Sequence, residues 1–223
     1  MAALRLDSDF VRQVSPPIVV GVDIGQRVDP TTIVVVEAFK IERPDRKPDF
    51  RFEVRHMERL AIGTPYPAVG TRIAEVVTTL EDRPVALHLQ PPKLTLVVDA
   101  TGVGRPVVDI LRDALHGSRC KLTPATFTHG DRLDTTSRQE WRVGKAFLVS
   151  RLQALFQTQR IKLPANHPEA QAMAKELVDY ELKIDPDGQD RYGAFKVGTH
   201  DDLVTALGLA VLRDPPGPQI WGT

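Results

Sequence analysis

Three runs of strand-forming residues near the start of the chain constrain its fold more than any other feature. Residues 18–24 and 31–39 are rich in β-branched side chains, and the connection between them carries Asp29-Pro30, which is typical of a hairpin. Residues 49–60 then alternate apolar and charged side chains, which predicts a third, half-buried strand. We therefore expect an antiparallel meander of three strands.

After residue 60 the pattern changes to alternating helices and strands. Apolar side chains recur every three or four residues over 66–80, which predicts an amphipathic helix, and residues 94–100 form the apolar run of a strand buried on both faces. The remaining predicted elements are a helix through 107–115, a strand over 121–128, helices over 143–157, 169–180 and 203–212, and a β-hairpin over 183–197. This order predicts an α/β fold: a five-stranded mixed sheet (three antiparallel strands, then αβαβα) with helices on both faces.

Length and composition suit one domain of this kind. The chain has 223 residues, of which 42% are hydrophobic and 26% charged. We expect an N-terminal arm over 1–16, the domain over 17–213 and a C-terminal tail over 214–223. No apolar run approaches the roughly 20 residues that span a bilayer, the N-terminus lacks a signal-peptide core, and the single Cys120 cannot form an internal disulfide. A cytoplasmic protein without membrane contact is the expectation.

Acidic residues lie at the edge of three strongly apolar elements. Asp23 falls within the first strand, Asp99 ends the buried strand over 94–100, and Asp201 and Asp202 open the last helix. A carboxylate in such a place is costly to desolvate unless it is paired or binds a cation. If these side chains meet, their repulsion favours a divalent cation with oxygen ligands, and two such ions can catalyse phosphodiester hydrolysis.

Each acid also has a purely structural interpretation. Asp23 can end a strand or hydrogen-bond the next turn, and Asp99 can cap the turn over 101–104. Thr199 and Asp202 have the spacing of a capping box, so Asp202 can simply start the helix. Only the combination of all three positions, on strand, strand and helix, favours catalysis.

The order of these motifs resembles the nuclease domain of the large terminase of tailed double-stranded DNA phages, a ribonuclease H-like fold related to Holliday-junction resolvases. The matching segments are residues 20–25 with 29–32 (VGVDIG, DPTT), 97–104 (VVDATGVG), 127–131 (FTHGD), 145–164 and 200–207 (HDDLVTAL). The match extends over about residues 17–213. Individually these motifs are weak, and their order and spacing carry the resemblance.

The resemblance implies a DNA endonuclease that uses two Mg²⁺ or Mn²⁺ ions to cut concatemeric viral DNA during genome packaging. Asp23 would bridge the ions, Asp99 would be the second ligand, and the third would come from Asp201 or Asp202, with Asp202 favoured because it lies deeper in the helix. His200 would orient a ligand or contact phosphate, unless it is an exposed loop residue.

Partners follow from the same resemblance. Double-stranded DNA is the expected substrate, and an ATPase domain, the small terminase and the portal are the packaging partners. The chain contains no Gly-x-x-x-x-Gly-Lys-Ser/Thr phosphate loop, so ATP-driven translocation is not encoded in these residues.

Bulk charge gives no argument for a DNA partner, because Lys plus Arg and Asp plus Glu both total 29. A basic surface must therefore be local, and residues 138–162 carry six basic residues against one acid. Within them Arg138, Arg142, Lys145 and Arg151 are the candidate phosphate contacts, although a solvated helix face has the same composition. The hairpin over 183–197 would guide the duplex or form a plain surface excursion.

Three other functions remain open at this point. A resolvase-like nuclease would share the acidic site. A single-domain relative of the actin and sugar-kinase phosphotransferases would share an early Asp-x-Gly turn, and a non-catalytic scaffold module would share the fold. A dinucleotide enzyme fits poorly, because the turn over 101–104 lacks the full Gly-x-Gly-x-x-Gly spacing.

Overall fold

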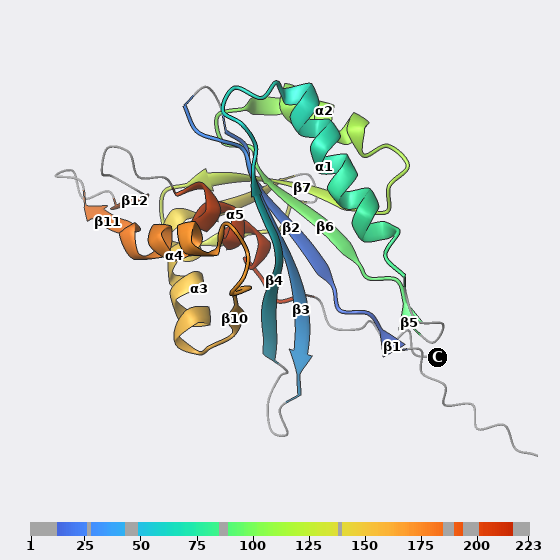
Figure 1. The fold of residues 1–223 in the computed structure, drawn as a ribbon. Helices are drawn as coiled ribbons and strands as arrows, with labels where there is room; N and C mark the ends of the chain where they lie inside the picture. The colour runs from blue at the N-terminus through green and yellow to red at the C-terminus, as the bar shows by residue number, and fades with distance from the viewer. Residues whose placement is uncertain are drawn as a thin grey trace, which may run out of the picture.

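A mixed sheet of eight strands forms the centre of the protein (Figure 1). The computed structural model describes residues 13–25, 28–42, 49–84, 89–137, 140–184, 190–193 and 201–215. The strand order is β10-β4-β3-β2-β6-β7-β9-β8. In chain order the strands are β2 (Ile18–Asp23), β3 (Thr32–Ile41), β4 (Asp49–Arg59), β6 (Leu94–Asp99), β7 (Lys121–Thr128), β8 (Leu133–Asp134), β9 (Trp141–Gly144) and β10 (Ile161–Lys162).

Five of these strands are the predicted ones, and they confirm the predicted fold class. β2, β3 and β4 pair antiparallel as a meander, and β6 and β7 follow parallel to β2 on its other side. The short strands β8, β9 and β10 extend the edges and were not predicted. Because residues 141–144 pair with β7, the helix expected over 143–157 begins only at Lys145.

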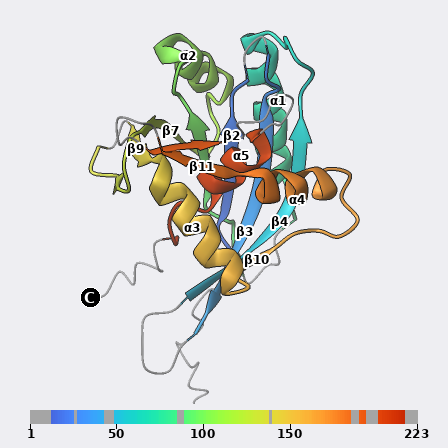
Figure 2. The same cartoon turned by 90° about the vertical axis from the view of Figure 1, so that its left-hand side faces the viewer.

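Five helices cover the two faces of the sheet (Figures 1 and 2). They are α1 (Tyr66–Glu81), α2 (Gly104–Ala114), α3 (Lys145–Gln157), α4 (Ala170–Asp179) and α5 (Asp202–Ala210). The helices α1 and α2 pack on one face, and α3, α4 and α5 lie on the other. Within the described ranges, none of the helices has the length and apolar character needed to cross a membrane.

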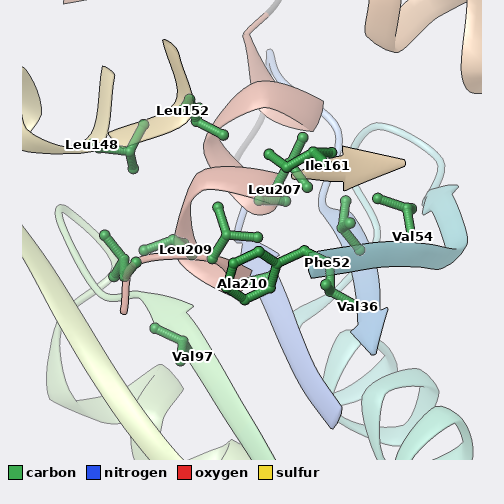
Figure 3. Close-up of a cluster of buried hydrophobic side chains, with 14 of the residues drawn as sticks. Val36, Phe52, Val54, Val97, Leu148, Leu152, Ile161, Leu207, Leu209 and Ala210 are labelled. Carbon is green, nitrogen blue, oxygen red and sulfur yellow. The ribbon is translucent and has the colours of Figure 1, made fainter. Parts of the chain in front are cut away.

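The alternating side chains of the strands fill two separate cores. The even-numbered residues of β2, Val20 and Val22 among them, pack with α1 and α2. The opposite core is formed by α5 and side chains such as Val97, Phe52 and Leu207, as Figure 3 shows. Since side chains of a strand point alternately to the two faces, residues 21 and 23 of β2 must face α5.

Two small ribbons flank the main sheet. β1 (Gln13–Val14), in the expected N-terminal arm, pairs in parallel with β5 (Leu89–Gln90). β11 (Glu181–Ile184) pairs antiparallel with β12 (Asp190–Gly193), in the region where the sequence predicts a hairpin. Residues 1–12, 185–189, 194–200 and 216–223, which include parts of the predicted arm, hairpin and tail, lie outside the described residues.

Candidate active site

Two of the predicted acids lie next to each other at the carboxyl edge of the parallel strands. Asp23 is the last residue of β2 and Asp99 the last of β6, and the residues before them, Val22 and Val98, are register partners. Paired strands lie about 4.8 Å apart, so the backbones of the two acids are direct neighbours. Val97, two residues before Asp99, belongs to the α5 core, so both acids face the α5 side of the sheet.

A close approach of α5 to β2 brings in the remaining pair of acids. A Cβ atom at Gly21 would lie 2.8 Å from the backbone nitrogen of Ala210 and only 2.0 Å from the carbonyl oxygen of Ala206. Glycine at this position therefore lets the helix rest directly on the strand. Ala206 and Ala210 lie over Gly21, while Asp202 acts electrostatically on Asp23, so α5 runs from Asp202 near Asp23 back along β2. Asp202 itself is buried, with 4% of its surface exposed.

The acids act on one another electrostatically. The pKa of the Asp23 carboxyl is raised well above its usual range, first by burial and then by the charges of Asp99, Asp202, Asp201 and Asp29. The last of these, Asp29, is an exposed residue of the turn after β2. Carboxylates from β2, β6 and α5 thus share one electrostatic environment.

The structural interpretation of Asp99 as a capping residue is confirmed. Its Oδ1 accepts a hydrogen bond of 2.7 Å from the Thr101 amide, so this carboxylate caps the turn that follows β6. Burial raises the pKa of Asp99, while the bonds from Thr101 and the charge of Lys145 lower it. Lys145, the exposed first residue of α3, therefore lies within electrostatic reach of the acidic edge, which the sequence did not indicate.

The donor set suits a hard divalent cation, because it consists of carboxylate oxygens whose mutual repulsion a cation would relieve. As the side chains stand, no three Asp, Glu, His or Cys groups within the described residues are close enough together to hold one ion. What the structure shows is that the acids lie at one edge of the sheet and act electrostatically on Asp23.

A buried ion-pair cluster lies behind α5 and was not predicted from the sequence. Glu176 of α4 accepts hydrogen bonds from the amides of Leu203 and Val204 in the first turn of α5, at 2.9 and 3.3 Å. Its other oxygen pairs with Arg59, which also binds Glu169 at 3.0 Å. The available signal was the position of Glu176, three residues after the buried Met173 on the apolar face of its helix.

The basic residues predicted to contact DNA do not form one surface. Arg142 and Lys145 are exposed and lie together where β9 meets α3. Arg151 instead donates hydrogen bonds to the Val211 carbonyl and to Asp214, which holds the chain after α5 in place. Lys162 lies on β10, at the opposite edge of the sheet from β9, and Arg138 is outside the described residues.

Two further predicted positions, Thr199 and His200, lie outside the described residues, and with Thr199 so does the predicted capping box of Thr199 and Asp202. In the turn after β2, the hydroxyl oxygen of Thr31 accepts a hydrogen bond of 3.1 Å from the Gly25 amide.

Comparison with known proteins places this arrangement in a family. A family model described as the terminase RNaseH-like domain matches residues 91–213. No curated protein matches the chain in sequence.

Solved structures share the fold. The large terminase nuclease of thermophilic phage G20c aligns with a TM-score of 0.58 at 20% identity, covering 87% of this chain and 81% of that one. The nuclease domain of the large terminase subunit of bacterial virus Sf6 aligns with a TM-score of 0.57 at 13% identity, covering 92% and 91%. The Mn-soaked human cytomegalovirus terminase nuclease domain aligns with a TM-score of 0.53 at 13% identity, covering 95% and 88%.

These findings confirm the resemblance inferred from the order of the sequence motifs. The family model covers more than half of the chain, including β6, α5 and the acids they carry. The protein has the fold of a terminase nuclease domain, and the chain belongs to the family of terminase RNaseH-like domains.

Proposed function

We propose that this chain is a metal-dependent DNA endonuclease that hydrolyses phosphodiester bonds by a two-metal mechanism and cuts concatemeric viral DNA during packaging. The observation that carries the proposal is that Asp99 and the Asp201-Asp202 pair all act electrostatically on Asp23 at one sheet edge of a terminase-type domain. Similar folds have been solved with Mg or Mn, including the G20c nuclease with bound magnesium and the Sf6 nuclease domain with manganese. Each relative is under 25% identical, so the chemistry rests on this chain's own residues.

Asp23, Asp99 and Asp202 would hold the ions, with Asp201 as the alternative to Asp202. Bound Mg²⁺ or Mn²⁺ supplies an activated water and stabilises the charge on the leaving oxygen. The raised pKa of Asp23 means that this carboxyl must lose its proton before it serves as a ligand, so binding weakens as the pH falls.

Lys145 and Arg142 would contact the DNA backbone beside the acids. Both are exposed cations at the start of α3 and on β9, and the charge of Lys145 reaches Asp99. Contacts to phosphate position a duplex without reading its sequence, so little sequence preference is expected. An ATPase domain and other packaging proteins would act with the chain in the cytoplasm of an infected or prophage-carrying host.

The test is cleavage of supercoiled plasmid with Mg²⁺, Mn²⁺ or EDTA. We expect the purified chain to cut only with metal, and Asp23→Ala and Asp99→Ala to reduce the rate at least about 100-fold. Asp109→Ala is the matched control, because this exposed acid of α2 lies on the other face of the sheet, where it pairs with Arg112. Equal rates for Asp23→Ala and the unmodified chain would refute the proposal.

Metal binding gives a second readout that does not depend on cleavage. We expect Mn²⁺ to raise the melting temperature of the unmodified chain and of Asp109→Ala, but not that of Asp23→Ala.

Faster cutting of a four-way junction than of linear duplex would assign the chain to resolvase-like chemistry instead of packaging.

A further inference from the structure

A buried carboxylate of α4 joins the first turn of α5 to the sheet. Glu176 is only 6% exposed. One of its oxygens accepts hydrogen bonds from the backbone amides of Leu203 and Val204, at 2.9 and 3.3 Å. The other oxygen forms an ion pair with Arg59 at the end of β4. These amides follow directly after Asp202, so the carboxylate contacts the turn that presents the proposed ligand.

This contact does for α5 what a capping side chain does within a helix. The first amides of a helix have no partner inside it, and a carboxylate there satisfies them and interacts favourably with the helix dipole. Here the carboxylate comes from another helix. Holding the first turn therefore restrains the position at which α5 begins. It also restrains the direction in which the Asp202 side chain extends from the helix.

The other end of the connection lies in the same row of the sheet as the first acid. Asp23 is the register partner of Thr32 on β3, and Thr32 is the register partner of Arg59 on β4. Glu176 thus connects the start of α5 to the row of residues from which Asp23 projects. A second carboxylate, Glu169, holds Arg59 at 3.0 Å.

We propose that Glu176 is a positioning residue of the acidic site: by binding Arg59 and the first turn of α5 at once, it sets the place of Asp202 relative to Asp23. Its catalytic consequence rests on the proposed nuclease function. Its contact with α5 is open to test without metal or DNA. Burial, and to a smaller extent the charge of Asp202, raises the pKa of Glu176 to about 7, while Arg59 and the amides of α5 lower it. The effect of Asp202 agrees with a carboxylate close behind the site.

The variants are Glu176→Ala, which removes both contacts, and Glu176→Gln, which keeps an acceptor for the α5 amides. Glu169→Ala is the matched control, because Glu169 precedes α4, binds the same Arg59 at 3.0 Å and has 27% of its side chain exposed. The first measurement is hydrogen exchange of the metal-free protein over residues 203–205. We expect exchange at least about 10-fold faster in Glu176→Ala, an intermediate rate in Glu176→Gln, and no change in Glu169→Ala.

The second measurement is the Mn²⁺ concentration that gives half-maximal cleavage. We expect it to rise about 10-fold or more in Glu176→Ala, with a smaller change in the rate at saturating Mn²⁺, and to recover partly in Glu176→Gln. A general loss of stability would not separate these two parameters, and Glu176→Gln supplies the comparison if Glu176→Ala fails to fold.

The outcomes separate the two hypotheses. Unchanged exchange over 203–205 in a folded Glu176 variant would overturn the positioning role, as would equal metal requirements in Glu176→Ala and Glu169→Ala. Failure of the unmodified chain to bind Mn²⁺ would refute the nuclease function, and the exchange measurement would then still decide whether Glu176 holds α5.

Discussion

Replacing Gly21 with alanine tests whether the close approach of α5 to β2 builds the acidic site. The new Cβ would lie 2.0 Å from the Ala206 carbonyl oxygen, whereas real Cβ contacts essentially never fall below 3.0 Å. The helix must therefore retreat by at least about 1 Å. The obstructed residue lies one helical turn after Asp202, so the acid moves with the helix by a similar amount.

The size of that shift sets the expected effects. Catalytic groups must be held within about 0.5 Å of their productive positions, and an error of about 1 Å costs roughly 100-fold in rate. Overpacking of a core also costs about 1 to 3 kcal/mol of unfolding free energy. At about 2 to 4 °C per kcal/mol for a chain of this length, the melting temperature should fall by roughly 2 to 12 °C.

The assays are thermal unfolding and metal-dependent plasmid cleavage, with Gly70→Ala as the control. In α1 a Cβ at Gly70 would lie 3.2 Å from Cγ2 of Ile110, a tight contact with a side chain, and alanine adds about 1 kcal/mol of helix propensity that offsets it. We expect Gly70→Ala to cleave at the unmodified rate. If Gly21→Ala also melts and cleaves as the unmodified chain does, the reasoning from close packing is wrong.

Three further predictions concern charge, packing and the thiol. Because folding raises the pKa of Asp23, the metal-free protein loses unfolding free energy as the pH rises through that raised pKa. Asp23→Asn should therefore melt about 1 to 8 °C higher than the unmodified chain at pH 8 without metal, and a lower melting temperature would contradict this. Leu207 is fully buried on α5, so Leu207→Ala should lose about 3 kcal/mol in denaturant unfolding, and a loss under 1 kcal/mol would show that the core collapses around the gap. Burial raises the pKa of Cys120 to about 12, so its thiolate fraction at pH 8 is roughly 1,000-fold below that of free cysteine, and native protein should react with iodoacetamide far more slowly than unfolded protein.

The central part of the fold was predictable because its signals are local. Apolar runs marked β2, β3 and β6, and Asp23 and Asp99 stood out as acids within these runs. That the two acids share one sheet edge follows from the parallel pairing of β2 with β6, which the structure shows. The edge strands β8 and β10 have two residues each, too few for any alternation to show. Their pairing depends on neighbours far along the chain, which a local pattern does not contain.

The surroundings of the site were harder to predict for the same reason. Glu176 and Arg59 are 117 residues apart, and a charged residue on a helix is usually solvated. The basic run over 138–162 shows the same limit, because residues close in sequence need not lie on one surface. Arg151 is used to hold Asp214, and Lys162 lies at the far edge of the sheet, so charges that are neighbours in sequence are separated in space.

The wide separation of the acids along the chain has a consequence for biosynthesis. Asp23 and Asp202 are roughly 180 residues apart, and α5 docks against β2 in the middle of the sheet. At a translation rate of about 5 to 20 residues per second, the first carboxylate is made some 10 to 40 s before the last. Nascent chains therefore carry the early strands without the complete set of acids, which comes together only after the ribosome has passed the final helix.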